Sequence, residues 1–413
     1  MSAEIVILAG SGSMHHARPL LEHFGDRALV EREWVPEAVM RHQPSLVITF
    51  DEHGAELGLC VGEAARRGVA TLQAMDGILE WRRTWQYPTS PEKRPLNQPA
   101  LAHKIACMGR ADARILESWG NVGKCEIIGS PRFDRLAATR RPIRTEPIAD
   151  RPLRLLVMTA KTPGFTPEQV EMTFRSLLDL KSHLAGRQDV EVIWRVTQKL
   201  HDRLGVENTV RNVLSTELHD ILATVDAVIT TPSTAILESM LCGHPVALLD
   251  YHNCPHYVPA AWVISCEGHI EPVLDELKAA PLARMLYQEF CLEDALACRT
   301  PALPRMAHLI DEMLRIRREC LAAGKPLAFP HRIVQDPVEQ VAWPSEAFDL
   351  KRLYPHHRVF GNREVTVLQA ELEAALGTIG ILKSQVELLS GRLNRIPGYR
   401  LAVNIYHALK QRR

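Results

Sequence analysis

Two long stretches of the chain alternate short apolar runs with amphipathic segments. In the first stretch, the apolar runs are Ile5–Ala9, Leu46–Phe50, Val69–Ala74, Lys104–Met108 and Glu126–Ile128. In the second, they are Leu155–Met158, Val190–Arg195, Ala227–Thr230, Pro245–Leu249 and Trp262–Ser265. Strands that alternate with helices form right-handed βαβ units and a parallel sheet. The pattern therefore predicts an α/β protein with two doubly wound halves.

A change in composition predicts where the two halves divide. Residues 137–153, AATRRPIRTEPIADRPL, have no hydrophobic period and are typical of an interdomain linker. We expect an N-terminal domain over residues 1–136 and a C-terminal domain over 154–330, closed by helices between about Ile270 and Ala323. Ligands of open α/β sheets bind beyond the carboxyl ends of the strands, so the expected site is the interdomain cleft.

The last part of the chain has a different pattern, which follows a predicted extended connector at 331–362. From Val365 to Ile396, apolar residues recur at steps of three and four, which is typical of a left-handed coiled coil. We expect a coiled coil over 363–396 that joins copies of the chain; a helix packed on its own domain is the alternative. The basic, aromatic-bearing segment 397–413 is typical of a membrane-surface helix, with a solvated tail as the alternative.

Composition excludes several classes of function. Among the 413 residues, Lys+Arg and Asp+Glu both total 49, so the chain has no global basic field and we expect no nucleic-acid partner. The 9 cysteines form no CxxC pair, which argues against a zinc ribbon and suits a reducing cytosol. No basic leader precedes the first apolar run, and no run reaches the ~18 residues of a membrane span. We expect a cytoplasmic protein, at most peripheral at the inner face of the membrane.

The segment from Leu222 to Tyr251, LATVDAVITTPSTAILESMLCGHPVALLDY, carries the strongest chemical signal. A buried strand leads to Thr231, Ser233 and Thr234 at a helix start, where hydroxyls and unpaired N–H groups meet the positive end of the helix dipole. Such a site suits a diphosphate. Glu238, one turn further on, faces the same side and can accept hydrogen bonds from a ribose diol. A plain helix cap with a surface glutamate is the alternative.

This segment resembles the donor-site signature of GT-B glycosyltransferases, particularly the bacterial surface-polysaccharide and CDP-glycerol glycerophosphotransferase-like group. The matching residues are Ser233, Thr234, Glu238, Gly243, Pro245 and Val246, followed by Asp250 and Tyr251. Lys104–Leu136, which ends in GSPRFDRL, is similar to the end of the N-terminal domain in the same group. The resemblance implies two Rossmann-like domains, with Ser233 and Thr234 on donor phosphates and Glu238 on the ribose.

The chain departs from this group at one place. Many members carry an Arg-x-His-Pro stretch where this chain reads WRVTQKL, so that Arg195 is kept and the His-Pro is not. The nucleotide base and the sugar of the donor therefore stay open.

Further candidate residues lie in other loops at strand ends. Thr159, Lys161 and Arg195 are expected donor contacts, with Lys161 as a point charge. The turn Gly10–Ser11–Gly12 is an incomplete dinucleotide fingerprint, and we expect it, with Arg132, on the acceptor side of the cleft. The candidates for the base that takes the acceptor proton are Asp51, Glu52, His53 and Asp76.

Together these features predict a metal-independent glycosyltransferase-like enzyme without a cofactor, because no Asp-x-Asp follows a strand. It would move a sugar or related unit from a nucleotide-sugar donor to a bacterial surface glycan or a lipid-linked acceptor. The run from Trp81 to Trp85 can stack on a sugar, lie under a lipid-linked acceptor, or pack on the domain surface. A UDP-sugar 2-epimerase-like enzyme and a non-catalytic scaffold protein are the alternative functions.

Overall fold

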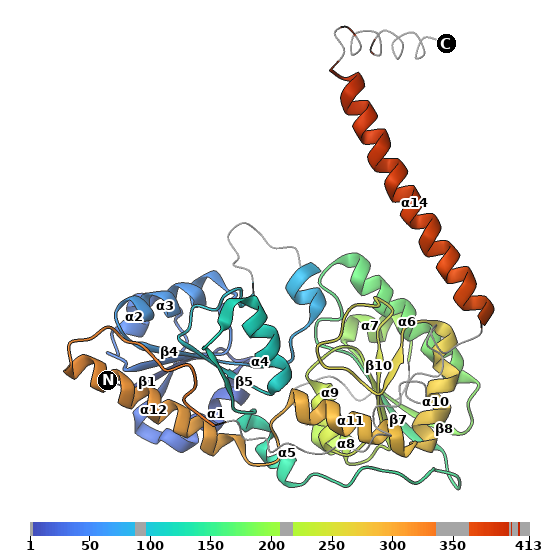
Figure 1. Ribbon diagram of the computed structural model, residues 1–413. Helices are drawn as coiled ribbons and strands as arrows, with labels where there is room; N and C mark the ends of the chain where they lie inside the picture. The colour runs from blue at the N-terminus through green and yellow to red at the C-terminus, as the bar shows by residue number, and fades with distance from the viewer. Residues whose placement is uncertain are drawn as a thin grey trace. The chain divides into compact units, whose positions relative to one another are not determined.

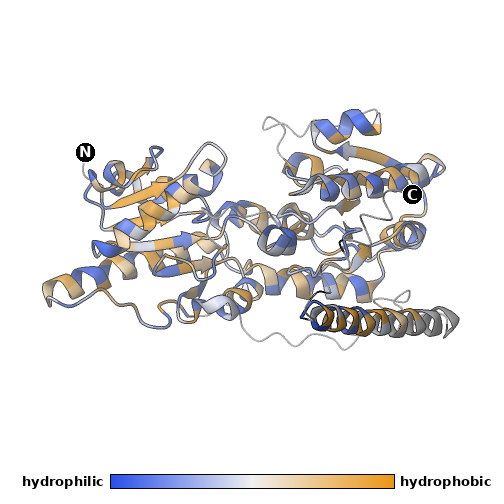
Figure 2. Cartoon of the chain, turned by 90° about the horizontal axis from the view of Figure 1, so that it is seen from above, coloured by the Kyte–Doolittle hydropathy of each residue, from blue (hydrophilic) through white to orange (hydrophobic). Residues whose placement is uncertain are grey.

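The computed structural model describes residues 3–86, 96–206, 218–335 and 363–395, together with Gly398 and Asn404. The chain divides into two compact units, Met1–Asp349 and Leu350–Arg413. The first unit contains two parallel sheets (Figure 1). Figure 2 shows the strands of these sheets as hydrophobic, whereas many surrounding helices have hydrophilic faces. This is the pattern of α/β sheets that are covered on both faces.

The N-terminal sheet has six parallel strands in the order β2-β1-β3-β4-β5-β6. The strands are β1 (Ile5–Leu8), β2 (Ala28–Glu31), β3 (Leu46–Thr49), β4 (Ala70–Ala74), β5 (Lys104–Cys107) and β6 (Cys125–Ile127). The helices around it include α1 (Met14–Phe24), α2 (Pro36–Met40), α3 (Ala55–Arg66), α4 (Arg110–Leu116) and α5 (Asp134–Ala138). The predicted strands of this half are confirmed. The edge strand β2 was not predicted, because it is short and only partly buried.

The C-terminal sheet has five parallel strands in the order β11-β10-β9-β7-β8. The strands are β7 (Leu153–Met158), β8 (Val190–Arg195), β9 (Ala227–Thr230), β10 (Val246–Leu249) and β11 (Trp262–Ile264). The helices are α6 (Pro167–Ala185), α7 (Gln198–Leu204), α8 (Leu218–Leu222), α9 (Ala235–Leu241), α10 (Ile270–Ala279) and α11 (Leu282–Ala295). Helix α6 begins at Pro167, because the Thr166 hydroxyl caps it by accepting a hydrogen bond from Gln169 N at 3.2 Å.

Helix α12 (Ala302–Ala322) packs on the N-terminal sheet, beside α1 (Figure 1). Met306, Ile310 and Met313 are buried in the same core cluster as β1, β3 and β4. Arg317 Nε also donates to Gly68 O at 2.9 Å. The prediction that helices up to about Ala323 close the C-terminal domain is therefore wrong for α12. The sequence shows that this helix has an apolar face, but tertiary packing decides which of the two sheets that face covers.

A buried ion pair holds the chain that follows α12 against the N-terminal domain. Lys104 Nζ and Glu126 Oε1 lie 2.7 Å apart, and both side chains are fully buried. Lys104 also donates to the carbonyls of Pro330 at 2.7 Å and His331 at 3.1 Å. Glu126 accepts from the N–H groups of Ile333 at 2.9 Å and Val334 at 3.0 Å. Part of the predicted extended connector is thus anchored; residues 336–362 lie outside the described residues.

Helix α14 (Arg363–Leu393) belongs to the second unit and confirms the helix expected there. Its exposed apolar residues include Leu372, Ile379, Leu382, Val386, Leu389 and Leu393, all of which belong to the predicted stripe. Pairing through this stripe stays a prediction. The basic tail at 397–413 lies outside the described residues, apart from Gly398 and Asn404. In the part of the chain that is described, no helix is both long and apolar enough to cross a bilayer.

Candidate functional site

The turn after β9 meets the loop after β4, so the two domains touch at the carboxyl ends of their strands. Thr234 Oγ1 accepts a hydrogen bond from Ile78 N at 3.2 Å. The approach is so close that a Cβ on Gly77 would lie 2.5 Å from the same hydroxyl. Met75 and Leu79 also share a core cluster with Ile236 and Leu237 of α9. The expected cleft is therefore closed at its floor by direct contact between the domains.

Three of the hydroxyls that were expected to bind the donor accept hydrogen bonds from backbone N–H groups instead. Thr231 Oγ1 accepts from Ala160 N at 2.9 Å, and Thr159 Oγ1 accepts from Thr197 N at 3.2 Å. Both residues are buried, and Thr234 contacts Ile78 as described. Among the described residues, the Ser233 hydroxyl has only a long contact of 3.5 Å with Thr230 Oγ1. The first helical residue of α9 is Ala235, two residues later than expected. Of these hydroxyls, Ser233 is the one that is best placed to meet a ligand.

A cluster of opposite charges lies beside this turn. Arg132 follows β6 and Arg195 ends β8, and burial lowers the pKa of both while the charge of Glu238 opposes that shift. The Nε atoms of both arginines are buried without a hydrogen-bond partner among the described residues. Glu238 Oε1 lies 3.5 Å from His219 Nε2, and its side chain is 14% exposed. A buried N–H group that lacks a partner is costly, unless a ligand such as an anion completes its hydrogen bonds.

Two histidines of α1 face the same cations. Burial, followed by the charges of Arg132 and Lys161, lowers the pKa of His15. Burial and Arg132 lower the pKa of His16 to about 2. Both rings are therefore neutral at pH 7 and add no charge to the cleft. The charge of Glu238 thus acts on Arg132 and Arg195, and the charges of Arg132, Lys161 and Glu238 all act on His15. The sequence analysis did not name these two histidines as candidates, although their position after the first strand was a usable signal.

The predicted bases have different surroundings. Glu52 is buried and accepts from the backbone N–H of Leu101 and from that of Ala102 at 2.8 Å, so it is a structural carboxylate, which corrects its place among the bases. Asp51 accepts from His53 N at 2.7 Å and lies 3.8 Å from Arg83. Burial raises the pKa of Asp76, against the opposing charge of Arg83. Arg132 also acts electrostatically on Asp76, which links this carboxyl group to the cation cluster.

The glycine turn after β1 has a packing role at its first position. A Cβ on Gly10 would lie 3.2 Å from the Trp34 ring, and Gly10 N donates to Ser13 Oγ at 3.1 Å. Ser11 is exposed, and a Cβ on Gly12 would have no neighbour within 4 Å. Gly10 therefore allows the close packing of Trp34, whereas Ser11 and Gly12 stay open to solvent. An acceptor contact at this turn remains a prediction for Ser11 and Gly12.

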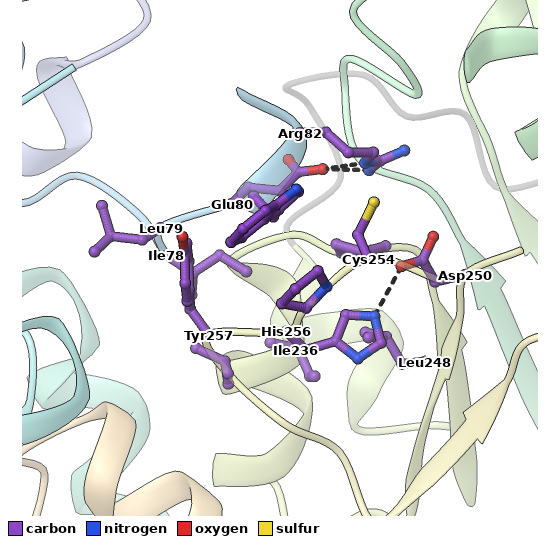
Figure 3. Close-up of a pocket in the computed structure, with 14 residues that line it drawn as sticks. Ile78, Leu79, Glu80, Arg82, Ile236, Leu248, Asp250, Cys254, His256 and Tyr257 are labelled. Carbon is purple, nitrogen blue, oxygen red and sulfur yellow. Dashed lines mark hydrogen bonds and ion pairs between the residues drawn. The ribbon is translucent and has the colours of Figure 1, made fainter. Parts of the chain in front are cut away.

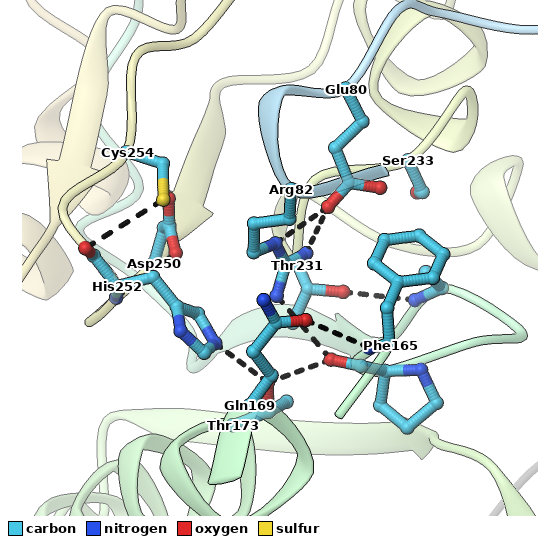
Figure 4. A network of polar contacts seen from close by, with 12 residues as sticks. Glu80, Arg82, Phe165, Gln169, Thr173, Thr231, Ser233, Asp250, His252 and Cys254 are labelled. Atoms are coloured by element: carbon cyan, nitrogen blue, oxygen red, sulfur yellow. Dashed lines mark hydrogen bonds and ion pairs between the residues drawn. The ribbon is translucent and has the colours of Figure 1, made fainter. Parts of the chain in front are cut away.

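Arg82 links the domains on the other side of the Gly77 contact. Although it belongs to the N-terminal half, its side chain is only 2% exposed and its NH1 group donates to Pro163 O at 3.4 Å. Its Nε donates to Glu80 at 2.6 Å. Figure 4 shows this pair within a network that extends to Gln169 and Thr173 of α6. Since Thr173 Oγ1 also donates to Pro163 O at 2.8 Å, the loop after β7 is held from both domains.

A pocket beside this network holds a carboxylate–histidine pair. Asp250 follows β10, and its Oδ2 lies 2.8 Å from His256 Nε2 (Figure 3). The lining residues are Ile78, Leu79, Glu80, Trp81, Arg82, Pro232, Ile236, Leu248, Asp250, Cys254, Pro255, His256, Tyr257 and Val258. Sequence reasoning named Asp250 only as part of a resemblance and did not single out His256. Within the described ranges, no three His, Cys, Asp or Glu side chains converge as metal ligands.

Solved structures share this fold, although no family model and no curated protein matches the chain. The UDP co-structure of MnaA from S. aureus has a TM-score of 0.54 at 12% identity, over 80% of this chain and 100% of that one. A putative UDP-N-acetylglucosamine 2-epimerase from Listeria monocytogenes has a TM-score of 0.54 at 14% identity, over 81% and 100%. A variant of the wall teichoic acid polymerase TagF has a TM-score of 0.50 at 11% identity, over 76% and 89%. The chain therefore has the two-domain GT-B fold.

Proposed function

We propose that this GT-B-fold chain is a glycosyltransferase-like enzyme that moves a sugar or related unit from a nucleotide-activated donor to a hydroxyl of a glycan or a lipid-linked acceptor. The observation that carries the proposal is that Arg132 and Arg195, on both of which the charge of Glu238 acts, have buried Nε atoms without a hydrogen-bond partner among the described residues. They come from different domains, so a ligand that contacts both spans the cleft.

The chemistry of this cluster suits a nucleoside diphosphate. Guanidinium groups bind phosphate oxygens through charge-assisted hydrogen bonds, and Lys161 adds a mobile point charge at the mouth of the site. Glu238 offers carboxylate oxygens to ribose hydroxyls. When the donor bond breaks, negative charge grows on the leaving phosphate, and preplaced cations stabilise it in a transition state. The proposed donor residues are Lys161, Arg195, Ser233 and Glu238, with Arg132 reaching the donor from the N-terminal domain.

The binding step is testable without knowledge of the acceptor. We expect UDP, CDP, GDP or CMP, or a sugar linked to one of them, to raise the melting temperature of the full chain. In Glu238→Ala the affinity for that nucleotide should fall by about 10- to 150-fold, because a charged hydrogen bond contributes ~1.5–3 kcal/mol. Glu319→Ala, on exposed α12 surface, is the matched control. Wild-type affinity in Glu238→Ala by calorimetry would contradict the donor assignment.

A 2-epimerase is the second candidate function. One of the structures that share the fold is a putative UDP-N-acetylglucosamine 2-epimerase, and another, MnaA, was solved with UDP. Asp51 and Asp76 follow strands β3 and β4 in the N-terminal half, and an epimerase would need two such groups, one as acid and one as base. An epimerase would exchange the hydrogen at C2 of a UDP-sugar with deuterium from solvent in the absence of any acceptor. A transferase would not, and would release nucleotide only when an acceptor or water is consumed.

Assembly and membrane contact belong to the same proposal. We infer that the apolar stripe of α14 pairs with a second copy of the chain, because Leu372, Ile379 and Leu382 are about half exposed in the single helix. The basic segment after residue 397 would then place the catalytic domains near an anionic leaflet, where a lipid-linked acceptor lies.

A further inference from the structure

We propose that a strap, residues 77–86 after β4 of the N-terminal domain, is a clasp that holds the two domains closed and must release before a ligand enters the cleft between them. The proposal rests on the proposed function only for the identity of that ligand, a nucleotide. The clasp itself is a property of the chain without nucleotide, so it can be tested separately.

The first residues of the strap pack on the turn before α9. Ile78 N donates to Thr234 Oγ1 at 3.2 Å. Gly77 allows this close approach, because a Cβ at that position would lie 2.5 Å from the same oxygen. Leu79 shares a buried apolar cluster with Ile236 of α9. The strap therefore continues the N-terminal domain in sequence but packs on the C-terminal domain in space.

The middle of the strap is buried against the C-terminal domain. Arg82 is 2% exposed, and its NH1 group donates to Pro163 O, in the loop after β7, at 3.4 Å. Figure 3 shows Ile78 and Leu79 of the strap on one side and residues of α9 and of the loop after β10 on the other. The cavity between these walls has a volume of about 20 Å³, which has room for a water molecule. This contact is thus a packed interface between the domains.

The end of the strap is held by two hydrogen bonds between side chains. Trp85 Nε1 donates to Tyr257 Oη at 2.9 Å, and Gln169 Nε2 donates to Gln86 Oε1 at 3.1 Å. Trp81 also lies near Tyr257, with ring centroids 6.2 Å apart. Gln169 belongs to α6, which Figure 4 shows beside Arg82, and Tyr257 belongs to the loop after β10. The strap therefore contacts several separate elements of the C-terminal domain.

The strap is attached away from the places where the chain crosses between the domains. The two crossings, after α5 and between α11 and α12, lie together, because Ala302 N donates to Asp134 Oδ1 at 2.7 Å. The second crossing is tightly packed: Ala297 N donates to Met108 O at 2.8 Å, and a Cβ on Gly129 would lie 2.6 Å from Ala297 O. In Figure 1 the helical end of the strap, in light blue, lies against the upper part of the C-terminal domain, whereas α5 lies at the bottom. We therefore expect the domains to pivot at the crossings and to open at the strap.

The closed arrangement shields part of the proposed donor site. The Nε atoms of Arg132 and Arg195 are buried. The cavity that Arg132 shares with His16 and Ser130 has a volume of about 10 Å³, which is close to the minimum for one water molecule. A phosphate group does not fit there unless the walls move. Because the two arginines come from different domains, separation of the domains would open this space.

The strap can release without leaving a charge unpaired. Arg82 Nε donates to Glu80 at 2.6 Å, and both residues belong to the strap, so this ion pair moves with it. The bonds that must break are the neutral ones at Ile78, Trp85 and Gln86, together with the bond from Arg82 to a carbonyl. Few and partly exposed bonds of this kind are typical of segments that open locally while the rest of a protein stays folded.

Hydrogen exchange of the chain without nucleotide tests the clasp. Peptides that cover residues 77–86 should be protected in the wild type. In Gly77→Ala their exchange should be about 2- to 12-fold faster, because the added Cβ disrupts the hydrogen bond between Ile78 and Thr234. Gly186→Ala is the matched control, since its Cβ would come no nearer than 4.0 Å to the listed neighbouring atom, and the strap should exchange there at the wild-type rate.

A second variant tests the clasp without a steric clash. Trp85→Ala removes the hydrogen bond to Tyr257 at a side chain that is 48% exposed, so the fold should persist and the strap should again exchange faster. Leu321→Ala, at another exposed apolar residue, is the control and should leave strap exchange unchanged. Wild-type exchange of the strap in both Gly77→Ala and Trp85→Ala overturns the clasp.

Binding kinetics test whether the strap controls ligand entry. The probe is whichever of UDP, CDP, GDP and CMP raises the melting temperature most, and stopped-flow tryptophan fluorescence follows its binding. In the wild type the observed rate should reach a plateau at high nucleotide concentration, set by release of the strap. The plateau should be about 2- to 12-fold higher in Gly77→Ala and unchanged in Gly186→Ala. An equal plateau in Gly77→Ala and wild type, or a rate that rises without a plateau, overturns control of entry by the strap.

These outcomes separate the clasp from the proposed function. If none of the four nucleotides binds, the donor assignment fails, while hydrogen exchange still decides whether the strap is a clasp. If a nucleotide binds but neither strap exchange nor the plateau changes in the variants, the clasp is rejected and the donor assignment stands.

Discussion

Lys104→Met should destabilise the protein strongly, because it breaks a fully buried ion pair. Lys104 Nζ donates to Glu126 Oε1 at 2.7 Å and to the carbonyls of Gly123, Pro330 and His331. The methionine side chain fills a similar volume but leaves the Glu126 carboxylate buried without its cation. Removal of one partner of a buried pair costs ~3–5 kcal/mol. Urea unfolding followed by circular dichroism should show that loss in the free energy of unfolding.

The double variant Lys104→Met/Glu126→Leu is the control for this reasoning. It removes both charges, so most of the stability should return, since replacement of a whole buried pair by apolar groups is often neutral. The recovery should be incomplete, because Ile333 N and Val334 N lose their acceptor. If Lys104→Met unfolds within ~1 kcal/mol of wild type, the charge is screened by water and the argument fails. Equal losses in the single and double variants would reject it as well.

Three further predictions concern other parts of the molecule. EDTA should leave nucleotide release intact if Arg132, Arg195 and Lys161 are the cations at the phosphates, as proposed; loss of turnover that Mg²⁺ restores would contradict this. Truncation before Val365 should keep nucleotide binding but lower the mass seen by light scattering and abolish sedimentation with anionic vesicles; an unchanged mass rejects pairing, and unchanged sedimentation rejects the membrane role. Burial raises the pKa of Asp112 from 3.8 to about 7, so its contribution to stability is present below 3.8 and is lost as the pH rises through about 7. The free energy of unfolding of Asp112→Asn should therefore fall less than that of the wild type over this pH range. An identical pH dependence of urea unfolding in the two proteins would refute the prediction.

The sequence was sufficient for the elements whose pattern is local. The bounds of β8 and β9 agree with the predicted segments, because each has a complete apolar run with turn residues at its ends. Short or edge elements were missed. Helix α2 has only five residues, Pro36–Met40, which is too short to show a helical period.

The candidate site was only partly predictable, because strand ends identify a region and not the partner of each side chain. Arg195 and Glu238 were named from their motifs, and the structure brings them within electrostatic range of each other. Glu52 was also a candidate from its position at a strand end, but its carboxylate accepts hydrogen bonds from the backbone N–H groups of Leu101 and Ala102, almost fifty residues later in the chain. The hydroxyls of Thr231 and Thr159 likewise accept hydrogen bonds from backbone N–H groups of neighbouring loops.

The amino-acid sequence alone determined two parallel sheets, the turn that carries Ser233 and the helix that carries Glu238, because burial of one face imposes a period that local residues must obey. Only the tertiary structure decided that α12 returns to the N-terminal sheet, that Arg82 is buried against the C-terminal domain, and that His256 meets Asp250. These contacts depend on which surfaces meet after the chain folds. The local sequence of an amphipathic helix, or the type of a polar side chain, does not identify the distant residue that it will contact.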